Sequence, residues 1–361
     1  MSIDIDVELL SLLGLSPALA GRALQSADTL PLPTTLSRII EVHRETHVLH
    51  DGRASHAARP LPRLLRMLQG EDAALAVGDW VLASRDGCGA AWIEARVAPS
   101  TQIVRRDGDG RRHVVVSNVD TALLVMGLDA DFNPRRLERY FALVHGEGIG
   151  AVVVLTKRDV AAPTDAVLDA RLADLRGRIP PSAEVLAIDA TNAAAADALA
   201  PCLGRGQTLV MLGSSGAGKS TLTNTLLGHC VQDTGPTREN DGRGKHTTTA
   251  RSLHRLPGGA CVIDTPGVRT LRPDGEGALA GVFADIAELA GHCRFRDCRH
   301  ESEPGCAVRA GVDADRLRNW HKLLRETRRD TATALDRQRE VAMWKARGRA
   351  AAARMRAKRE A

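Results

Sequence analysis

Residues 213–221, Gly-Ser-Ser-Gly-Ala-Gly-Lys-Ser-Thr, have the composition and spacing of a phosphate-binding loop. Glycines let backbone N–H groups converge on phosphate oxygens, and a helix that begins here adds positive potential. Lys219 would neutralise the terminal phosphates, and the Ser220 hydroxyl would ligate Mg²⁺. Residues 209–212 predict a buried strand before the loop, and residues 221–227 predict a helix after it. The nucleotide-binding residues predicted here are Gly213, Ser214, Ser215, Gly216, Ala217, Gly218, Lys219, Ser220 and Thr221.

A second motif, Asp-Thr-Pro-Gly at residues 264–267, follows the loop at the end of another predicted strand. The Asp264 carboxylate can hold Mg²⁺ through water, and Gly267 can offer its N–H to the γ-phosphate. Between the motifs lies a polar, glycine-rich stretch, residues 235–249, which can order around Mg²⁺ and the γ-phosphate. One of its threonines is expected to bind Mg²⁺, and we favour Thr248. The alternative is a plain mobile loop.

The residue that orients the attacking water is the least defined part of this site. Val268 follows Gly267 directly, and no glutamine is close in sequence. A hydrophobic side chain cannot orient water, so intrinsic hydrolysis is expected to be slow, with a partner completing the site. His246 is the best substitute in the chain, although it is equally consistent with a solvent-facing polar residue.

A base-recognition motif, Thr156-Lys157-Arg158-Asp159, follows another predicted buried strand. Asp159 can accept hydrogen bonds from guanine N1 and N2, which adenine cannot supply, and the Lys157 stem can pack over the base. Thr156 replaces the usual asparagine. Residues 188–191 have the place of a base-cradling loop but only half of its expected sequence. A mixed-charge surface turn is the competing interpretation of the tetrapeptide.

The order of these motifs indicates a circular permutation, because the base motif precedes the phosphate loop instead of following the Asp-Thr-Pro-Gly motif. Apolar runs at 119–126, 151–155, 185–188, 209–212 and 261–263 alternate with predicted helices. Runs of this kind, covered on both faces, predict a mostly parallel sheet. One predicted helix follows Asn133 as N-cap and Pro134 as its first residue.

Three cysteines and one histidine cluster near the C-terminus as Cys293, Cys298, His300 and Cys306. Three thiolates and an imidazole with no open position fit one closed, tetrahedral, structural Zn²⁺ site. The segment is too polar for ordinary core cysteines. His292 is a competing ligand, but its adjacency to Cys293 disfavours it.

The elements that must carry these motifs suggest a multidomain α/β protein. The chain has 361 residues, 2% of them aromatic, so its cores must consist mainly of Leu, Val, Ile and Ala. Short β-like runs between residues 36 and 116 predict a small barrel of the oligonucleotide-binding (OB) type. Trp80 and Trp92 are its only tryptophans, so RNA backbone contacts are expected instead from Arg105, Arg106, Arg111 and Arg112. The predicted divisions are a lead-in (1–34), a barrel (35–116), an α/β domain (117–275), a zinc-binding helical domain (276–330) and a basic tail (331–361).

Net charge is +5, and much of the positive charge lies in the arginine-rich tail. The tail is either a solvated basic helix or a segment that contacts nucleic acid. No apolar run is long enough to cross a membrane, and the acidic N-terminus lacks the basic start of a signal peptide. We therefore expect a cytoplasmic protein without a membrane partner.

Taken together, the chain resembles the ribosome small-subunit-dependent GTPase A family (RsgA/YjeQ). The resemblance covers about residues 35–325 and is carried by the OB-like barrel, the permuted GTPase motifs and the Cys-x₄-Cys-x-His-x₅-Cys pattern. Further matching stretches include residues 76–81, 118–121, 126–140 and 246–249. The resemblance implies a monomeric late assembly factor that binds the small ribosomal subunit and its rRNA. It also implies slow GTP hydrolysis that the subunit accelerates, and release after hydrolysis.

Two other functions compete with this one. The first is a P-loop ATPase or nucleotide kinase that carries a structural zinc site. The second is an RNA-binding P-loop NTPase without ribosome-stimulated turnover, in which the nucleotide is only a structural ligand. The absence of a nearby glutamine keeps the second in consideration.

Overall fold

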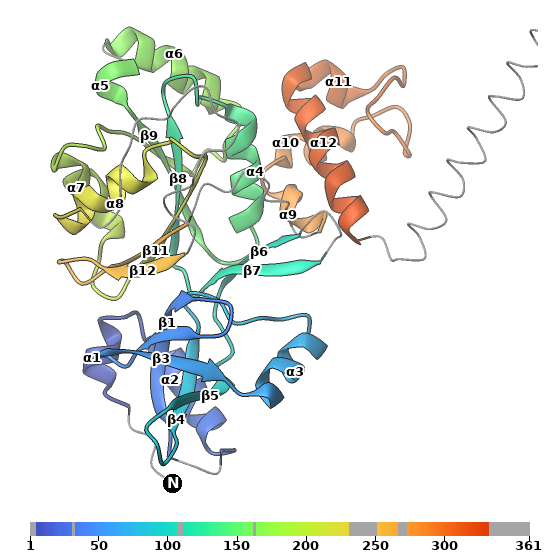
Figure 1. Cartoon of the computed structure of the whole chain (residues 1–361). Coiled ribbons are helices and arrows are strands. Elements are labelled where there is room, and N and C mark those ends of the chain that lie inside the picture. Colours follow the sequence, from blue (N-terminus) through green and yellow to red (C-terminus); the bar gives the residue numbers. More distant parts are fainter. Residues whose placement is uncertain are drawn as a thin grey trace, which may run out of the picture.

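The computed structural model describes residues 5–30, 33–106, 111–161, 164–230, 251–265, 273 and 275–331. Figure 1 shows a barrel below, a sheet flanked by helices above it, and a group of C-terminal helices at the side. Two short helices precede the barrel, α1 (Val7–Ser11) and α2 (Pro17–Ala27). Asp6 caps α1 by accepting from Leu9 N, and Ser16 caps α2 by accepting from Leu19 N.

Five strands form the predicted barrel: β1 (Thr35–Val42), β2 (His47–His50), β3 (Ser55–Pro60), β4 (Trp80–Arg85) and β5 (Ala91–Arg96). Their order is β1-β2-β3-β5-β4, and an antiparallel β1–β4 pairing closes the barrel. Helix α3 (Pro62–Gly70) lies between β3 and β4 in the chain. Closed five-stranded topology of this kind is that of an OB barrel, as predicted. Neither β3 nor α3 was predicted. Strand β3 has no large apolar residue, whereas α3 buries Leu64 and Leu68 on one helical face, a spacing from which it could have been predicted.

The barrel interior accounts for one of the two tryptophans. Trp80 is fully buried, whereas Trp92 is half-buried and donates from Nε1 to Asp86 Oδ2 at 3.0 Å. Trp80 is therefore a core residue and cannot stack on a base. Gly78, just before β4, has a φ of +93°, and a Cβ there would lie 2.0 Å from the Ser117 carbonyl oxygen. Only glycine fits this close approach of two chain segments.

A separate two-stranded hairpin, β6 (Gln102–Arg106) and β7 (Arg112–Ser117), lies between the barrel and the next sheet. That next sheet contains β8 (Thr121–Gly127), β9 (Gly150–Thr156), β10 (Glu184–Ala187), β11 (Thr208–Gly213), β12 (Ser252–Arg255) and β13 (Cys261–Asp264). Its order is β10-β9-β8-β11-β13-β12, with parallel pairing except for β12. Strand β11 thus lies between β8 and β13 in the sheet. Strand β8 comes well before β11 in the chain, and β13 comes after it.

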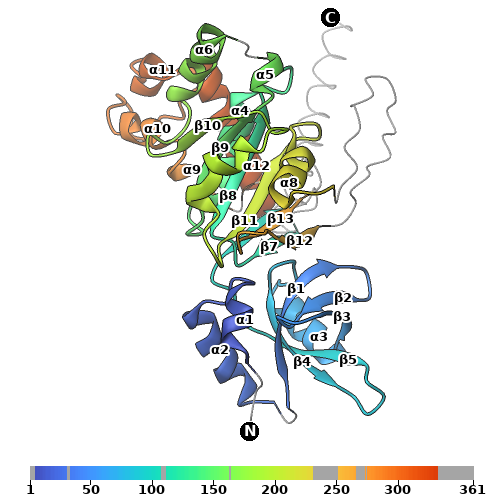
Figure 2. The same cartoon turned by 90° about the vertical axis from the view of Figure 1, so that its left-hand side faces the viewer.

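Helices cover both faces of this sheet (Figure 2). They are α4 (Pro134–Val144), α5 (Arg158–Ala161), α6 (Asp165–Arg176), α7 (Ala194–Leu199), the 3₁₀ turn η1 (Ala200–Cys202) and α8 (Lys219–Leu227). Alternate β8 residues belong to different cores. Leu123 packs with Leu222 of α8 and Leu199 of α7, whereas Leu124 packs with Leu137 of α4. This alternation follows from the two-residue period of a strand. Asn133 precedes α4 as predicted, but its side chain makes no capping hydrogen bond.

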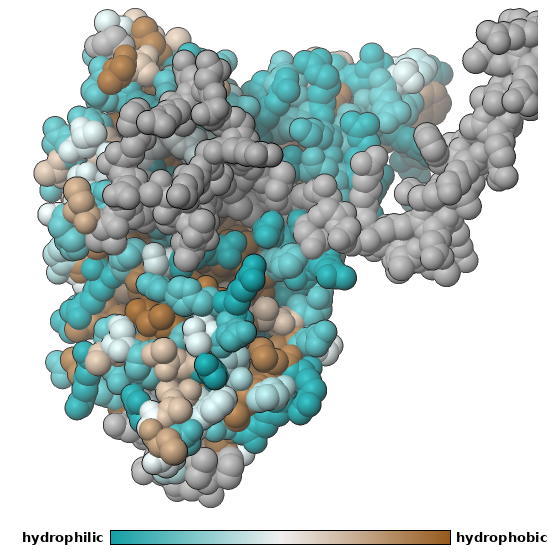
Figure 3. Space-filling view, in the orientation of Figure 1, coloured by the Kyte–Doolittle hydropathy of each residue, from teal (hydrophilic) through white to brown (hydrophobic). Residues whose placement is uncertain are grey.

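The C-terminal helices, α9 (Gly277–Ala280), α10 (Ala284–Ala290), α11 (Ala307–Gly311) and α12 (Ala314–Thr331), pack beside α4. We call residues 275–328 the C-terminal module. On the face shown in Figure 3 this module is mostly hydrophilic. The basic tail lies outside the described residues, and the predicted domain boundaries stay predictions.

Arg38 joins three parts of the molecule. It is fully buried on β1, and its guanidinium donates to Gly78 O at 3.2 Å, to Asn118 O at 2.8 Å and to Thr208 Oγ1 at 2.8 Å. It also donates to the Leu13 carbonyl, between α1 and α2. The barrel, the lead-in helices and the first residue of β11 are therefore joined by one buried side chain whose three guanidinium nitrogens all donate hydrogen bonds.

Candidate nucleotide-binding and metal sites

The phosphate loop connects β11 to α8, in the predicted strand–loop–helix context. Gly216 and Gly218 have φ angles of +82° and +94°, in the left-handed region that favours glycine. At Gly213 a Cβ would lie 2.5 Å from the Val125 carbonyl oxygen, so the loop begins hard against β8. Ser215 and Gly216 are exposed, whereas Ser220 and Thr221 are half-buried at the start of α8. The loop therefore presents its backbone to solvent at a helix N-terminus.

Lys219 folds back over this loop. Its side chain donates from Nζ to Gly213 O at 3.0 Å and to Ser214 O at 2.7 Å, and the residue is 6% exposed. Burial lowers the pKa of Lys219, while the charges of Asp264 and Asp131 oppose that shift. The ammonium group thus lies inside the loop, close to two carboxylates that favour its charged form.

Asp264 is placed beside the loop by the sheet register. It is the last residue of β13, pairs with Met211 of β11, and is 1% exposed. The adjacent Thr265 hydroxyl donates to Met211 O at 2.6 Å, which fixes the exit of the strand. The structure therefore brings together Lys219 and Asp264, as predicted. Gly267, His246 and Thr248 lie outside the described residues, so their predicted roles stay predictions.

The base motif reaches the same loop from β9. The Thr156 hydroxyl donates to Ala217 O at 2.6 Å, and a Cβ on Gly218 would lie 3.2 Å from Thr156 Oγ1. Threonine in place of the usual asparagine therefore still anchors the phosphate loop. Arg158 and Asp159 are exposed in the first turn of α5. Asp159 is thus accessible to a ligand.

Lys157 has an uncommon backbone conformation, with a φ of +61°. Its Nζ donates to Asp129 Oδ2 at 2.7 Å, which directs the side chain along the segment after β8. The suspected base-cradling loop is adjacent: Arg158 N donates to Ile188 O at 3.4 Å, and Thr225 Oγ1 donates to Ala190 O at 2.7 Å. A backbone hydrogen bond thus joins this loop to the base motif, and the Thr225 side chain joins it to α8.

The four predicted metal ligands converge in the C-terminal module. The ligand atoms of Cys293, Cys298, His300 and Cys306 all lie within 4.8 Å of one another. His300 Nδ1 is 3.6 Å from Cys293 Sγ and 3.4 Å from Cys306 Sγ, and these two sulfurs are 3.9 Å apart. Tetrahedral Zn²⁺ with ordinary bond lengths requires about 3.6 Å between N and S and about 3.8 Å between sulfurs. The set therefore fits zinc, and His292 is not part of it. All seven cysteines lie in the described part of the chain, and none is in a disulfide.

Comparison with known proteins agrees with this geometry. The RsgA GTPase family model matches residues 97–273. "Small ribosomal subunit biogenesis GTPase RsgA" of Xanthomonas oryzae pv. oryzae (strain MAFF 311018) is 47% identical over 313 residues, which cover 84% of this chain and 83% of that protein. The protein of the same name from Xanthomonas axonopodis pv. citri (strain 306) is 48% identical, covering 80% of each chain. This chain belongs to the RsgA GTPase family.

Two solved structures show the same fold. YjeQ from Thermotoga maritima superposes with a TM-score of 0.57 at 21% identity, covering 81% of this chain and 98% of that one. YloQ, described as a circularly permuted GTPase, superposes with a TM-score of 0.53 at 22% identity, covering 83% and 97%. The predicted fold class is confirmed: an OB-like barrel, a circularly permuted GTPase sheet and a helical module with a Cys₃His cluster. As an RsgA GTPase, the chain is a GTP-hydrolysing enzyme, and the family implies Mg²⁺ with GTP.

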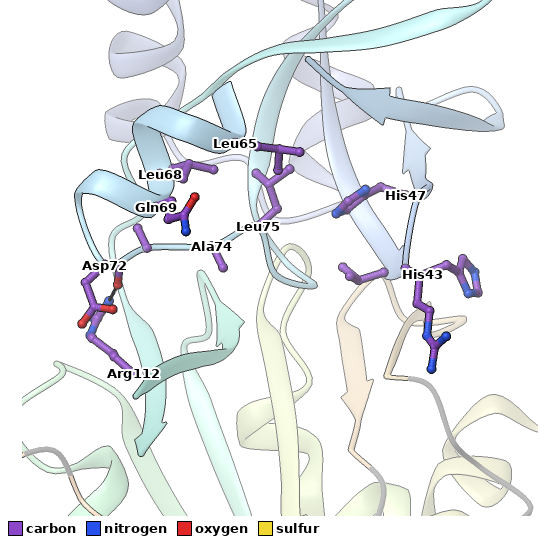
Figure 4. Close-up of a pocket in the computed structure, with 12 residues that line it drawn as sticks. His43, His47, Leu65, Leu68, Gln69, Asp72, Ala74, Leu75 and Arg112 are labelled. Carbon is purple, nitrogen blue, oxygen red and sulfur yellow. Dashed lines mark hydrogen bonds between the residues drawn. The ribbon is translucent and has the colours of Figure 1, made fainter. Parts of the chain in front are cut away.

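One hollow lies on the barrel, away from the phosphate loop. It has a volume of about 320 Å³ and lies between α3, the β1–β2 turn and β7 (Figure 4). Leu68 and Leu75 give it an apolar floor, and Arg44 and Arg112 add positive charge at its rim. Arg112 donates to Asp72 O at 3.3 Å. The predicted RNA-contacting arginines 105, 106, 111 and 112 all lie on the hairpin beside this hollow.

Among the described residues no helix is both long and apolar enough to cross a membrane.

Two functional candidates were missed by motif analysis. Asp129 contacts the base motif, and Asp131 Oδ1 accepts from Ser214 Oγ in the phosphate loop at 2.5 Å. Two sequence signals pointed to them: both lie in the family-matching stretch 126–140, and both come directly after a predicted buried strand, where polar residues meet the edge of a parallel sheet.

Proposed function

We propose that this chain binds the small ribosomal subunit, acts late in its assembly, and hydrolyses GTP to GDP and phosphate. The subunit stimulates hydrolysis, and hydrolysis releases the protein. The observation that supports this proposal is that a complete phosphate loop lies beside Asp264 in a permuted GTPase sheet. The curated relatives that align over more than four-fifths of this chain are named for small-subunit biogenesis.

The positions of Lys219, Ser220 and Asp264 support the following roles. Lys219 neutralises the β- and γ-phosphates, Ser220 offers its hydroxyl to Mg²⁺, and Asp264 holds the hydrated ion. When bound, Mg²⁺ supplies charge that stabilises the transferring phosphoryl group. Gly267 and Thr248 complete the γ-phosphate side of the site in this proposal, and His246 is our candidate for positioning the attacking water.

Guanine selectivity rests on the exposed Asp159, with Lys157 packing its stem over the base. Thr156 contributes by anchoring the phosphate loop instead of contacting the base. Because adenine lacks the N1–H and N2–H donors, an aspartate at this position favours GTP over ATP.

The remaining parts supply binding to the subunit. The arginines of the β6–β7 hairpin contact rRNA phosphates, and one structural Zn²⁺ holds the C-terminal module in shape. The proposed partner places the protein in the cytoplasm, where bacterial ribosomes assemble, and the proposal needs only one copy of the chain.

The deciding experiment is GTP hydrolysis with and without purified small ribosomal subunits, with ATP as the nucleotide control. Lys219→Ala serves as the inactive control, and Asp159→Asn tests whether Asp159 selects guanine. We expect strong stimulation by subunits for GTP only, loss of turnover in Lys219→Ala, and a shift from GTP towards xanthosine triphosphate in Asp159→Asn. Equal use of ATP would contradict the guanine assignment. Absence of stimulation would instead favour an RNA-binding NTPase that does not respond to the ribosome.

A further inference from the structure

The segment between β8 and α4, residues 128–133, lies between the two halves of the nucleotide site. Asp129 Oδ2 accepts from Lys157 Nζ at 2.7 Å, on the side of the base motif. Asp131 Oδ1 accepts from Ser214 Oγ at 2.5 Å, on the side of the phosphate loop. Two carboxylates separated by one residue therefore hold two motifs that are far apart in sequence.

Both carboxylates have fixed orientations. Asp131 Oδ2 accepts from Gly127 N at 3.2 Å, and Asp129 Oδ1 accepts from Asp131 N at 3.2 Å. Arg136, in the first turns of α4, donates to Asp131 Oδ1 as an ion pair, and the Asp131 side chain is only 15% exposed. Gly127 packs so closely against Asp129 that a Cβ there would collide with its carboxylate. The segment is thus a rigid support and not a loose connection.

The support is itself anchored on its far side. Arg135 of α4 pairs with Asp315, and Arg139 pairs with Glu326 at 2.6 Å, both on α12 of the C-terminal module. Helix α4 therefore cannot shift without breaking contacts to that module, and the two carboxylates keep their places relative to β8.

We propose that Asp129 and Asp131 are positioning residues for GTP binding. Asp131 holds Ser214 and so keeps the phosphate loop in its binding shape, while Asp129 directs Lys157 along the base site. The inference rests on the proposed function as a GTPase. Neither carboxylate is suited to contact phosphate directly, because like charges repel, so each acts through the residue that donates to it.

The physical reason is preorganisation. A phosphate loop must aim several N–H groups at once, and ordering them during binding lowers affinity by the entropy that is lost. An anchor made before binding removes that cost. The exposed Lys157–Asp129 pair adds little to folding, since surface ion pairs are worth roughly 0–1 kcal/mol. Its effect is expected in nucleotide affinity instead.

The test is a double-mutant cycle on nucleotide affinity in the full-length chain. Fluorescent GDP is titrated into the wild type, Asp131→Ala, Ser214→Ala and the double variant. We expect each single variant to raise Kd about tenfold, as loss of a hydrogen bond to a charged group does. The double variant should be no weaker than either single variant, because both remove the same contact. Additive losses, or a wild-type Kd in Asp131→Ala, would overturn the proposal.

Two controls separate positioning from general charge or folding effects. Asp174→Ala removes an exposed carboxylate of α6 and should leave Kd unchanged. Asp131→Asn keeps an acceptor for Ser214 and should recover most of the affinity. With saturating GTP and small subunits, kcat of Asp131→Ala should match the wild type while KM rises. An unchanged KM with a lower kcat would contradict a positioning role.

Asp129 is tested in the same way. Asp129→Ala should weaken GDP binding several-fold, and Lys157→Met should add nothing further to it. If the wild type binds and turns over GTP but all of these variants behave like it, only this inference fails. If the wild type prefers ATP, the proposed function fails first.

Discussion

The Arg316 guanidinium donates to Glu138 Oε1 at 2.8 Å, and the two side chains are 6% and 0% exposed. Arg316 also pairs with Asp285 and donates to Val282 O at 2.8 Å, while Asn319 donates to the other Glu138 oxygen. This ion pair joins α12 to α4. It attaches the C-terminal module to the GTPase sheet through charges whose hydrogen bonds are satisfied.

Arg316→Met should destabilise the protein by about 3 kcal/mol, because it removes the closest charged partner of the buried Glu138 carboxylate and leaves it with Asn319 and with Arg178 at 3.7 Å. Burial already raises the pKa of Glu138, and the Arg316 charge opposes that shift. The measurement is urea unfolding at neutral pH. Arg318→Met is the matched control, since the Arg318 side chain is 69% exposed in its pair with Asp315 and its loss should cost less than about 0.5 kcal/mol. Equal losses in the two variants would contradict this account.

Thr156→Val should weaken GDP binding about tenfold, because it removes the hydroxyl and leaves the Ala217 carbonyl without its donor. Thr156→Ser keeps the hydroxyl and should bind nearly as well as the wild type. Both affinities can be measured with fluorescent GDP. If valine were tolerated as well as serine, the hydroxyl would have no part in anchoring the loop.

Metal analysis of the purified protein should find one zinc per chain. Cys306→Ser should lower the zinc content and the melting temperature, because the metal's binding free energy contributes to folding. His292→Ala should change neither, since His292 is outside the cluster. Elemental emission and calorimetry measure the two quantities. Retention of full zinc by Cys306→Ser would show that the ligand set is wrong.

Stability should depend on pH through Asp79, a fully buried barrel residue that accepts from Ala76 N at 2.8 Å. Burial raises the pKa of Asp79 to about 6, although the Arg96 and Arg38 charges oppose the shift. Between its unfolded pKa of about 4 and its folded value, the native state binds more protons, so Asp79 contributes less stability as pH rises.

Asp79→Asn should abolish this contribution while keeping an acceptor for Ala76. As pH rises from about 4.5 to about 6, the unfolding free energy of the wild type should therefore fall relative to that of Asp79→Asn, so the two curves converge or cross. At higher pH the two curves should run parallel. Parallel curves over the whole range would mean that Asp79 does not titrate in this window.

Local patterns in the sequence identified most of the elements. Apolar runs located β8, β9, β10, β11 and β13, and glycine spacing located the phosphate loop. Strand β3 was not predicted because it has no large apolar residue, whereas the i, i+4 spacing of Leu64 and Leu68 in helix α3 was a signal that could have located that helix. The Asn133 side chain makes no capping bond although its type and place predicted one, because capping depends on local angles that residue type alone does not set.

The sequence by itself determined the chemistry: which residues can bind phosphate, guanine and zinc, and the permuted order in which they occur. These properties depend on residue type and short spacing, so they are local. The tertiary structure decided which distant residues meet. It placed Thr156 against Ala217, Asp131 against Ser214, and Arg38 against Thr208. Such contacts depend on strand order and on how helices pack on the sheet, which no short stretch of sequence encodes.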